Sequence, residues 1–317
     1  MTADTHDTFA GKCGRKRRGG FALVVVLFIV VMMAVMVASF SMRTSGSYRL
    51  ARSRAASWRM YYAARAAAEE AKAKLWQQFV AAKEAGAIKA PPENEEYTVG
   101  GVKVSIVYED EAGKLPINGF AAGDDAKRKD LALILARLFD ELSVPNSTSV
   151  ATAVRDFVDE DGDGLRESGA KNDALFDICE LLAVRGLSAE DLYGRKSAES
   201  PTAASMLTTW RLGGVNLNSA RGELMKAISA RLTEGDVREI IAARVERPFE
   251  SIDDLRARTK ITDETISEMT AWAGFSTDTM TLKIEARLGS FVRRIEEVIW
   301  LESTAGHTLY MREGRQD

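Results

Sequence analysis

An acidic segment near the middle of the chain carries the residues best suited to bind a metal ion. Carboxylates recur at alternate positions and a glycine follows at the sixth, in the sequence DEDGDG at 159–164. Calcium takes oxygen ligands from positions one, three and five of such a loop, from a backbone carbonyl at position seven, and often through water from position nine. These positions are occupied by Asp159, Asp161, Asp163, Leu165 and Glu167. The sequence therefore predicts a structural calcium site.

The second half of this loop departs from the pattern of an EF-hand. Position twelve, where an EF-hand has a bidentate glutamate, is Ala170. Asn172, Asp173 or Asp177 could complete the coordination shell instead, and Asp173 is the residue we add to the predicted ligand set. The alternative is a solvated acidic loop without a metal, because aspartate and glycine are also the commonest turn residues.

An apolar run close to the N-terminus predicts a membrane anchor. Residues 21–40, FALVVVLFIVVMMAVMVASF, contain no charged side chain and as a helix would cross the hydrocarbon core of a bilayer, about 30 Å thick. Five basic residues precede the run: Lys12, Arg15, Lys16, Arg17 and Arg18. By the positive-inside rule we expect a cytoplasmic N-terminus, with the chain after about residue 43 across the membrane. A buried core helix and an ordinary signal peptide cleaved near residues 38–41 are the alternatives.

The composition argues against two other functional classes. The chain of 317 residues has a formal net charge of −3, and without its first 20 residues the charge is about −6, which does not suit the binding of nucleic-acid phosphates. The histidines are His6 and His307, and neither lies in a motif that suggests a nucleophile or a metal ligand. The sequence contains no Gly-rich phosphate loop, cysteine pair or G-x-S-x-G motif. We therefore expect neither an enzyme nor a nucleic-acid-binding protein.

The secondary structure that would position these residues follows from composition and periodicity. Good helix formers continue from residue 41 to about residue 84, with aromatic and leucine residues that can form an apolar stripe. Polar and apolar residues then alternate around Gly100 and Gly101, which predicts a β-hairpin. We expect an α+β, pilin-like fold: a long N-terminal helix on an antiparallel sheet that is interrupted by a large all-helical inserted domain.

The expected boundaries divide the chain into five segments. They are a leader at 1–20, a transmembrane and stem helix at 21–85, the first part of the sheet at 86–118, the helical insertion at 119–275 and the last part of the sheet at 276–317.

The helical insertion contains a diverged internal repeat. Residues 154–192 and 237–266 each predict a short helix, a loop, and then a second and a third helix. Phe176 in the first copy and Phe249 in the second are expected to pin the second helix. Cys179 has no expected disulfide partner, and we expect it to be a small buried apolar residue.

Several motifs resemble one protein family. A basic leader ending in Gly20, followed by Phe21, an apolar helix and a β-rich part, resembles the type IV pilin and pseudopilin superfamily. The resemblance implies that a prepilin peptidase cuts after Gly20 and methylates Phe21. Most members have a glutamate at the fifth mature position, which here is Val25, and its absence is a trait of the K-type minor pseudopilins of type II secretion (general secretion pathway protein K). Three further segments resemble that branch: DEAGKLPIN at 110–118, VNLNSA at 215–220 and RPFESIDDL at 247–255.

The resemblance also implies a place in the cell and a set of partners. It implies a structural protein at the tip of the pseudopilus, which initiates or caps assembly for protein export across the outer membrane. The partners implied are the I- and J-type minor pseudopilins, the major pseudopilin and the prepilin peptidase, with the anchor in the inner membrane and the C-terminal part in the periplasm. Calcium binding is known in this family, which adds to the local argument for the acidic loop.

Two other functions remain open at this point. One is a minor pilin of a type IV pilus. The other is a membrane-tethered DNA-uptake protein, because residues 215–266 resemble helix-hairpin-helix units that grip the DNA backbone. The corresponding turn, RLTEGD at 231–236, has acidic residues that would repel phosphate, so we expect the hairpin to contact protein rather than nucleic acid.

Overall fold

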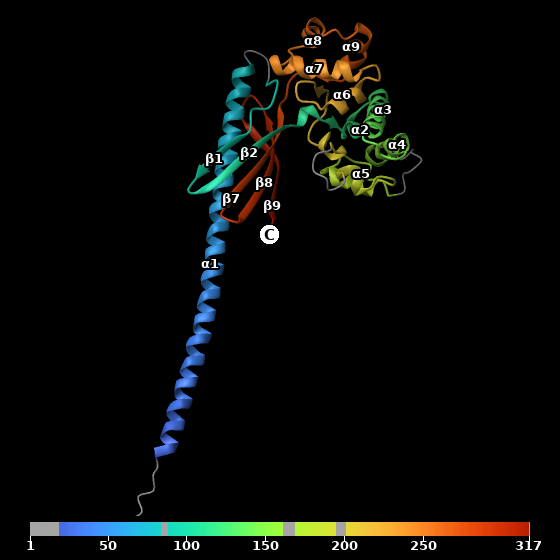
Figure 1. Ribbon diagram of the computed structural model, residues 1–317. Coiled ribbons are helices and arrows are strands. Elements are labelled where there is room, and N and C mark those ends of the chain that lie inside the picture. Colours follow the sequence, from blue (N-terminus) through green and yellow to red (C-terminus); the bar gives the residue numbers. More distant parts are fainter. Residues whose placement is uncertain (1–18, 84–87, 161–168, 195–200, 317) are drawn as a thin grey trace, which may run out of the picture. The chain divides into compact units, whose positions relative to one another are not determined.

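The computed structural model describes residues 19–83, 88–160, 169–194 and 201–316 (Figure 1). The chain divides into two compact units, Met1–Ser57 and Trp58–Asp317. Helix α1, Gly19–Lys83, contributes residues to both of them.

In the first unit, α1 carries the apolar run predicted to cross a membrane. Among the described residues this is the one helix that is long and apolar enough to do so, and none of its most apolar stretch is buried. Phe21 and Phe40, at the two ends of the run, are 79% and 73% exposed. A soluble protein would bury such side chains in its core, so their exposure is compatible with a single-pass membrane anchor.

In the second unit, five strands form an antiparallel sheet in the order β1-β2-β7-β8-β9. They are β1 (Glu95–Val99), β2 (Val102–Asp110), β7 (Thr279–Leu288), β8 (Phe291–Leu301) and β9 (Gly306–Gln316). The predicted hairpin is confirmed: β1 and β2 are joined through Gly100 and Gly101, whose φ angles of 57° and 81° favour glycine.

One face of this sheet packs on the part of α1 that belongs to the second unit. The helix contributes small side chains, which let helix and sheet approach closely: Ala63, Ala64, Ala67, Ala68 and Ala71, with Met60 and Leu75 at the ends. Strand β2 contributes alternate residues, Val102, Val104, Ile106 and Tyr108. The period of two places Glu109 and the other intervening residues of β2 on the opposite face of the sheet.

Between β2 and β7 the chain forms a mainly helical body with a core of its own (Figure 1). Its α-helices are α2 (Gly119–Ala122), α3 (Asp125–Glu141), α4 (Ser147–Val158), α5 (Ala189–Tyr193), α6 (Gly222–Ile228), α7 (Glu234–Glu246), α8 (Ile252–Arg258) and α9 (Asp263–Thr270). Its 3₁₀-helices are η1 (Glu111–Gly113), η2 (Ile178–Ala183) and η3 (Ala203–Ser205). Four two-residue strands form two parallel pairs, β3 (Leu115–Pro116) with β4 (Leu207–Thr208) and β5 (Val215–Asn216) with β6 (Ala273–Gly274).

The predicted α+β fold is confirmed: a long N-terminal helix lies on an antiparallel sheet, and a large helical insertion interrupts that sheet. The two short parallel strand pairs were not predicted from the sequence. The pair of β3 with β4 joins the start of the helical body to its middle, and the pair of β5 with β6 joins its middle to its end.

Two side-chain predictions within the insertion are wrong. Cys179 is exposed, not buried, and Phe176 is 76% exposed, whereas its counterpart Phe249 is fully buried. The second helix of the first copy is the 3₁₀-helix η2, of which only Leu181 is buried. Because a 3₁₀-helix has three residues per turn, it directs a narrower row of side chains toward the core than the predicted α-helix would. Phe176 instead lies under the ammonium group of Lys171, 4.5 Å from the ring centre.

Candidate functional site

The three segments at 110–118, 215–220 and 247–255 meet where the chain passes from the sheet into the helical body. Asp110 ends β2 and is 5% exposed. Its Oδ2 accepts a hydrogen bond from Asn216 Nδ2 at 2.8 Å and another from Ser219 Oγ, and its Oδ1 accepts one from the Ala112 amide at 2.7 Å. One buried carboxylate thus joins the first of these segments to the second.

Asn218 joins the second segment to the third. Its Oδ1 accepts a hydrogen bond from the Phe249 amide at 2.7 Å, and its Nδ2 donates to the Phe249 carbonyl at 2.9 Å and to the Phe275 carbonyl at 3.1 Å. The side-chain amide therefore satisfies both backbone groups of a fully buried residue, as a neighbouring strand would.

Asn118 repeats this arrangement at the other end of the first segment. Its Oδ1 accepts a hydrogen bond from the Leu175 amide at 2.7 Å, and its Nδ2 donates to the carbonyls of Leu175 and Thr209 at 2.9 and 2.8 Å. Asn118 and Asn218 together fasten loops that carry no regular backbone pairing at these points.

The close approach of the first and second segments depends on a glycine. A Cβ atom at Gly113 would lie 2.6 Å from Ser219 Oγ and 3.0 Å from the Ser219 backbone carbon. Such contacts are shorter than van der Waals distance, and one of them is to backbone that cannot rotate away. A side chain at this position would force the two segments apart.

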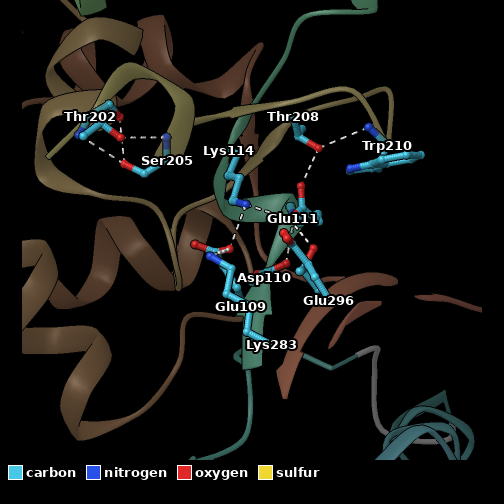
Figure 2. Close-up of polar contacts among 12 residues, drawn as sticks. Glu109, Asp110, Glu111, Lys114, Thr202, Ser205, Thr208, Trp210, Lys283 and Glu296 are labelled. Atoms are coloured by element: carbon cyan, nitrogen blue, oxygen red, sulfur yellow. Dashed lines mark hydrogen bonds and ion pairs between the residues drawn. The ribbon is translucent and has the colours of Figure 1, made fainter. Parts of the chain in front are cut away.

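Glu111 forms the centre of a buried charge cluster at the same junction (Figure 2). Its side chain is 3% exposed, its Oε1 accepts hydrogen bonds from Lys114 Nζ and Thr281 Oγ1, and its Oε2 accepts one from Thr208 Oγ1, each at 2.6 Å. Thr281 belongs to β7 and Thr208 to β4. One carboxylate therefore contacts the sheet and the helical body at once. A buried charge is tolerated because it is paired and fully hydrogen-bonded.

Glu109 extends the cluster onto the face of the sheet that points away from α1. Its Oε2 lies 3.2 Å from Lys114 Nζ and 2.7 Å from Lys283 Nζ. Burial acts to raise the pKa of Glu109, but the two ammonium groups outweigh it and hold that pKa below its usual value. Burial likewise acts to lower the pKa of Lys114, but Glu111 and Glu109 outweigh it and raise that pKa. Glu109 and Lys114 are both charged at neutral pH.

A cleft of about 300 Å³ opens beside this cluster, between the sheet and the helical body. The strand register places Lys283, Glu296 and Arg312 side by side across the sheet, and Arg312 NH2 lies 2.6 Å from Glu296 Oε2. The ring of Trp210 lies 5.0 Å from that of Tyr310 at the rim. The charged side chains of the cleft pair with each other. We therefore interpret the cleft as part of the contact that holds the helical body to the sheet.

The predicted processing residues lie at the start of α1. Gly20 and Phe21 are both in its first turn, and Gly20 has no atom within 4 Å of the position that a Cβ would take. The cut between these two residues stays a prediction.

The predicted calcium ligands lie only in part within the described residues. Asp161, Asp163, Leu165 and Glu167 are outside them, whereas Asp159 follows α4 and is 4% exposed, and Asp173 is exposed. The two ends of the acidic segment are held together, because the amides of Lys171 and Asn172 both donate to the Phe157 carbonyl at 3.0 Å. Among the described residues, no group of three or more His, Cys, Asp or Glu side chains is arranged to hold a metal.

The sequence prediction of this loop omitted Asp156. This residue is 1% exposed and lies one turn before Asp159 on α4. Its Oδ1 accepts hydrogen bonds from Arg155, at 3.2 Å from Nε and 2.8 Å from NH2, while its buried Oδ2 has no hydrogen-bond partner among the described residues. A carboxylate three positions before the first predicted ligand was the signal that could have identified it.

Comparisons with known proteins find a family and a solved structure to which this chain is similar. Residues 215–274, which include the second and third of the joined segments, match the family described as type II secretion system (T2SS), protein K. A chain in the crystal structure of the GspK-GspI-GspJ complex from the type 2 secretion system of enterotoxigenic Escherichia coli has the same fold. The TM-score is 0.61 at 14% sequence identity, over 83% of this chain and 100% of that chain. No curated protein matches the sequence.

Proposed function

We infer that this chain is a K-type minor pseudopilin of the type II secretion system. The observation that carries this conclusion is the match of residues 215–274 to protein K of that system. The matched segment contains Asn216 and Asn218, which fasten the helical body at its junction with the sheet. The segment that matches the family model therefore also contains residues that hold the helical body at the sheet.

We propose that the protein stands at the tip of the pseudopilus with the I- and J-type minor pseudopilins, where it initiates or caps assembly for protein export. A solved complex that contains a chain of this fold is that of GspK with GspI and GspJ, which supports these partners. Val25 supports the place at the tip. A glutamate in the apolar helix is costly in lipid unless it pairs with a neighbouring subunit of the filament. A subunit at the tip has no neighbour ahead of it for such a pair, and this chain has Val25 at that position.

Co-purification tests this function. When the full chain is produced with the I- and J-type pseudopilins of the same organism, we expect a complex of all three after detergent extraction and affinity capture. Minor pilins of a type IV pilus, produced in the same way, serve as the matched control and should not be retained. Retention of the type IV minor pilins alone, or salt-dependent binding of DNA by the captured protein, would instead favour one of the two rival functions.

The mature N-terminus is a second expected result. Mass spectrometry of the purified protein should find a chain that begins at methylated Phe21, because the peptidase of this family cuts after the glycine. Gly20→Leu should prevent the cut, so the measured mass should be that of the chain with its leader attached. A chain that begins near Ser41 would show ordinary signal-peptide cleavage and would contradict the membership.

The orientation of the anchor is part of the same proposal. Five basic residues precede the apolar run, but five also follow it: Arg43, Arg49, Arg52, Arg54 and Arg59. The positive-inside rule counts both flanks, so charge alone does not orient this helix. The cytoplasmic N-terminus and the periplasmic C-terminal part are therefore proposed from the resemblance to the pseudopilins of type II secretion.

We also propose that the acidic loop binds a structural calcium ion. Asp159 is the ligand at position one, and Asp156 lies one turn before it with a buried oxygen that no described residue satisfies. A buried carboxylate oxygen without a hydrogen bond is costly, and a cation bound beside it would remove that cost. The backbone hydrogen bonds from the Lys171 and Asn172 amides to the Phe157 carbonyl hold the two ends of this segment together.

Thermal unfolding checks the calcium proposal. With calcium at about a hundred times its Kd, the melting temperature of the full chain in detergent should exceed the value in chelator by about 5–10 °C. Asp159→Asn should abolish this difference, whereas Asp253→Asn, at an exposed acidic position on α8, should keep it. An equal melting temperature of the unaltered protein with calcium and with chelator would disprove the site.

A further inference from the structure

The part of α1 that follows the apolar run is strongly cationic. Arg43, Arg49, Arg52 and Arg54 lie within 12 residues of the first unit, and each is exposed. No acidic residue occurs between Asp7 and Glu69 in the sequence. Within the described part of the chain, none of the four guanidinium groups has a hydrogen bond or an ion pair to another side chain. Their charge is therefore not neutralised by any residue that the structure describes.

The position of these arginines relative to the apolar run indicates what can neutralise them. At 1.5 Å per helical residue, Arg43 is about 4.5 Å beyond Phe40 and Arg54 about 21 Å beyond it. The headgroup layer on each side of a bilayer is about 5–8 Å thick. Arg43 then lies among the headgroups, and the next arginines stand in the water just outside them, where an anionic surface still attracts cations.

We propose that residues 43–54 bind anionic phospholipid headgroups of the leaflet from which α1 emerges. The planar guanidinium group of Arg43 can form paired hydrogen bonds to a lipid phosphate, whereas the three arginines beyond the headgroups attract anionic lipids through their charge. Each basic residue held close to an anionic surface strengthens binding about fivefold, and less with distance from it. The bound lipids would retain the subunit in the membrane until assembly replaces them. The proposal needs the membrane anchor only and goes beyond the secretion role.

Lipid selection by the full chain tests this proposal. The protein is placed in nanodiscs with equal amounts of phosphatidylglycerol and phosphatidylcholine, and the lipids that stay bound after transfer to detergent are counted by native mass spectrometry. We expect phosphatidylglycerol to dominate. A variant with Arg43→Gln, Arg49→Gln, Arg52→Gln and Arg54→Gln should lower the ratio of bound phosphatidylglycerol to phosphatidylcholine by about fivefold or more.

The matched control replaces four exposed basic residues of the second unit. The control substitutions are Lys103→Gln, Lys129→Gln, Arg221→Gln and Lys260→Gln, which should leave the ratio unchanged. The leader is the same in all three proteins, so it does not contribute to the differences, and carbonate extraction shows that each protein is inserted.

Three results would overturn the proposal. They are equal retention of both lipids by the unaltered protein, a ratio that the four arginine substitutions leave unchanged, and an equal loss in the control variant. Co-purification with the I- and J-type pseudopilins is measured on the same variants. Loss of these partners with an unchanged lipid ratio would assign the arginines to acidic partner helices instead. If the lipid ratio fails to change as expected while the I- and J-type partners still bind, only the lipid proposal is contradicted and the proposed function is not.

Discussion

Replacement of Glu111 by alanine should destabilise the folded protein by about 3–5 kcal/mol, the usual cost of removing one partner of a buried ion pair. Three donors lose their acceptor together: the ammonium group of Lys114 and the hydroxyls of Thr208 and Thr281. Lys114 and both threonines are buried, so water cannot replace the carboxylate without opening the junction. The free energy of unfolding, from urea denaturation followed by circular dichroism, measures this loss.

Two further variants sharpen the interpretation of that result. Glu111→Gln keeps an acceptor for the hydroxyls but not the negative charge, so it should lie between the unaltered protein and the alanine variant. Glu70→Ala removes a glutamate of α1 that is 57% exposed in its side chain and pairs with Lys74, and it should leave the urea midpoint nearly unchanged. If Glu111→Ala shifted the midpoint no more than Glu70→Ala, the buried cluster would not hold the helical body to the sheet.

A loss of similar size, about 3–5 kcal/mol, is expected for Asn218→Ala, because each buried polar group left unsatisfied costs about 1–3 kcal/mol. The substitution removes both partners of the Phe249 backbone and one partner of the Phe275 carbonyl. Phe249 is fully buried, so its amide and carbonyl cannot turn to solvent. The same urea experiment measures the effect.

Asn146 provides the matched control for this asparagine. It is exposed, its side chain caps nothing, and its φ of 55° is one that glycine adopts without strain. Asn146→Gly should therefore leave the free energy of unfolding close to that of the unaltered protein. A loss in Asn218→Ala no greater than in this control would mean that the loops at the junction hold their conformation without the side-chain amide.

Asn218 shows what could be predicted for this protein from its sequence and what could not. The motif at 215–220 resembles the K-type family, and the match of residues 215–274 to that family agrees with the resemblance, but the motif did not indicate that Asn218 bonds to the backbone of Phe249. Similarly, the pattern of alternating carboxylates predicted a calcium loop beginning at Asp159, but the buried Asp156 one turn earlier emerged only from its position on α4.

The sequence by itself determined the features that depend on neighbouring residues: the apolar run at 21–40, the hairpin at Gly100 and Gly101, and the helical character of the insertion. Local periodicity decides these, because each is stabilised within one helix or between adjacent strands. Tertiary structure alone decided the junction. Asp110 meets Asn216 across 106 positions and Glu111 meets Thr281 across 170, distances over which no sequence period carries information. The same reason explains the exposure of Cys179, since this depends on how the short 3₁₀-helix η2 packs against the rest of the body.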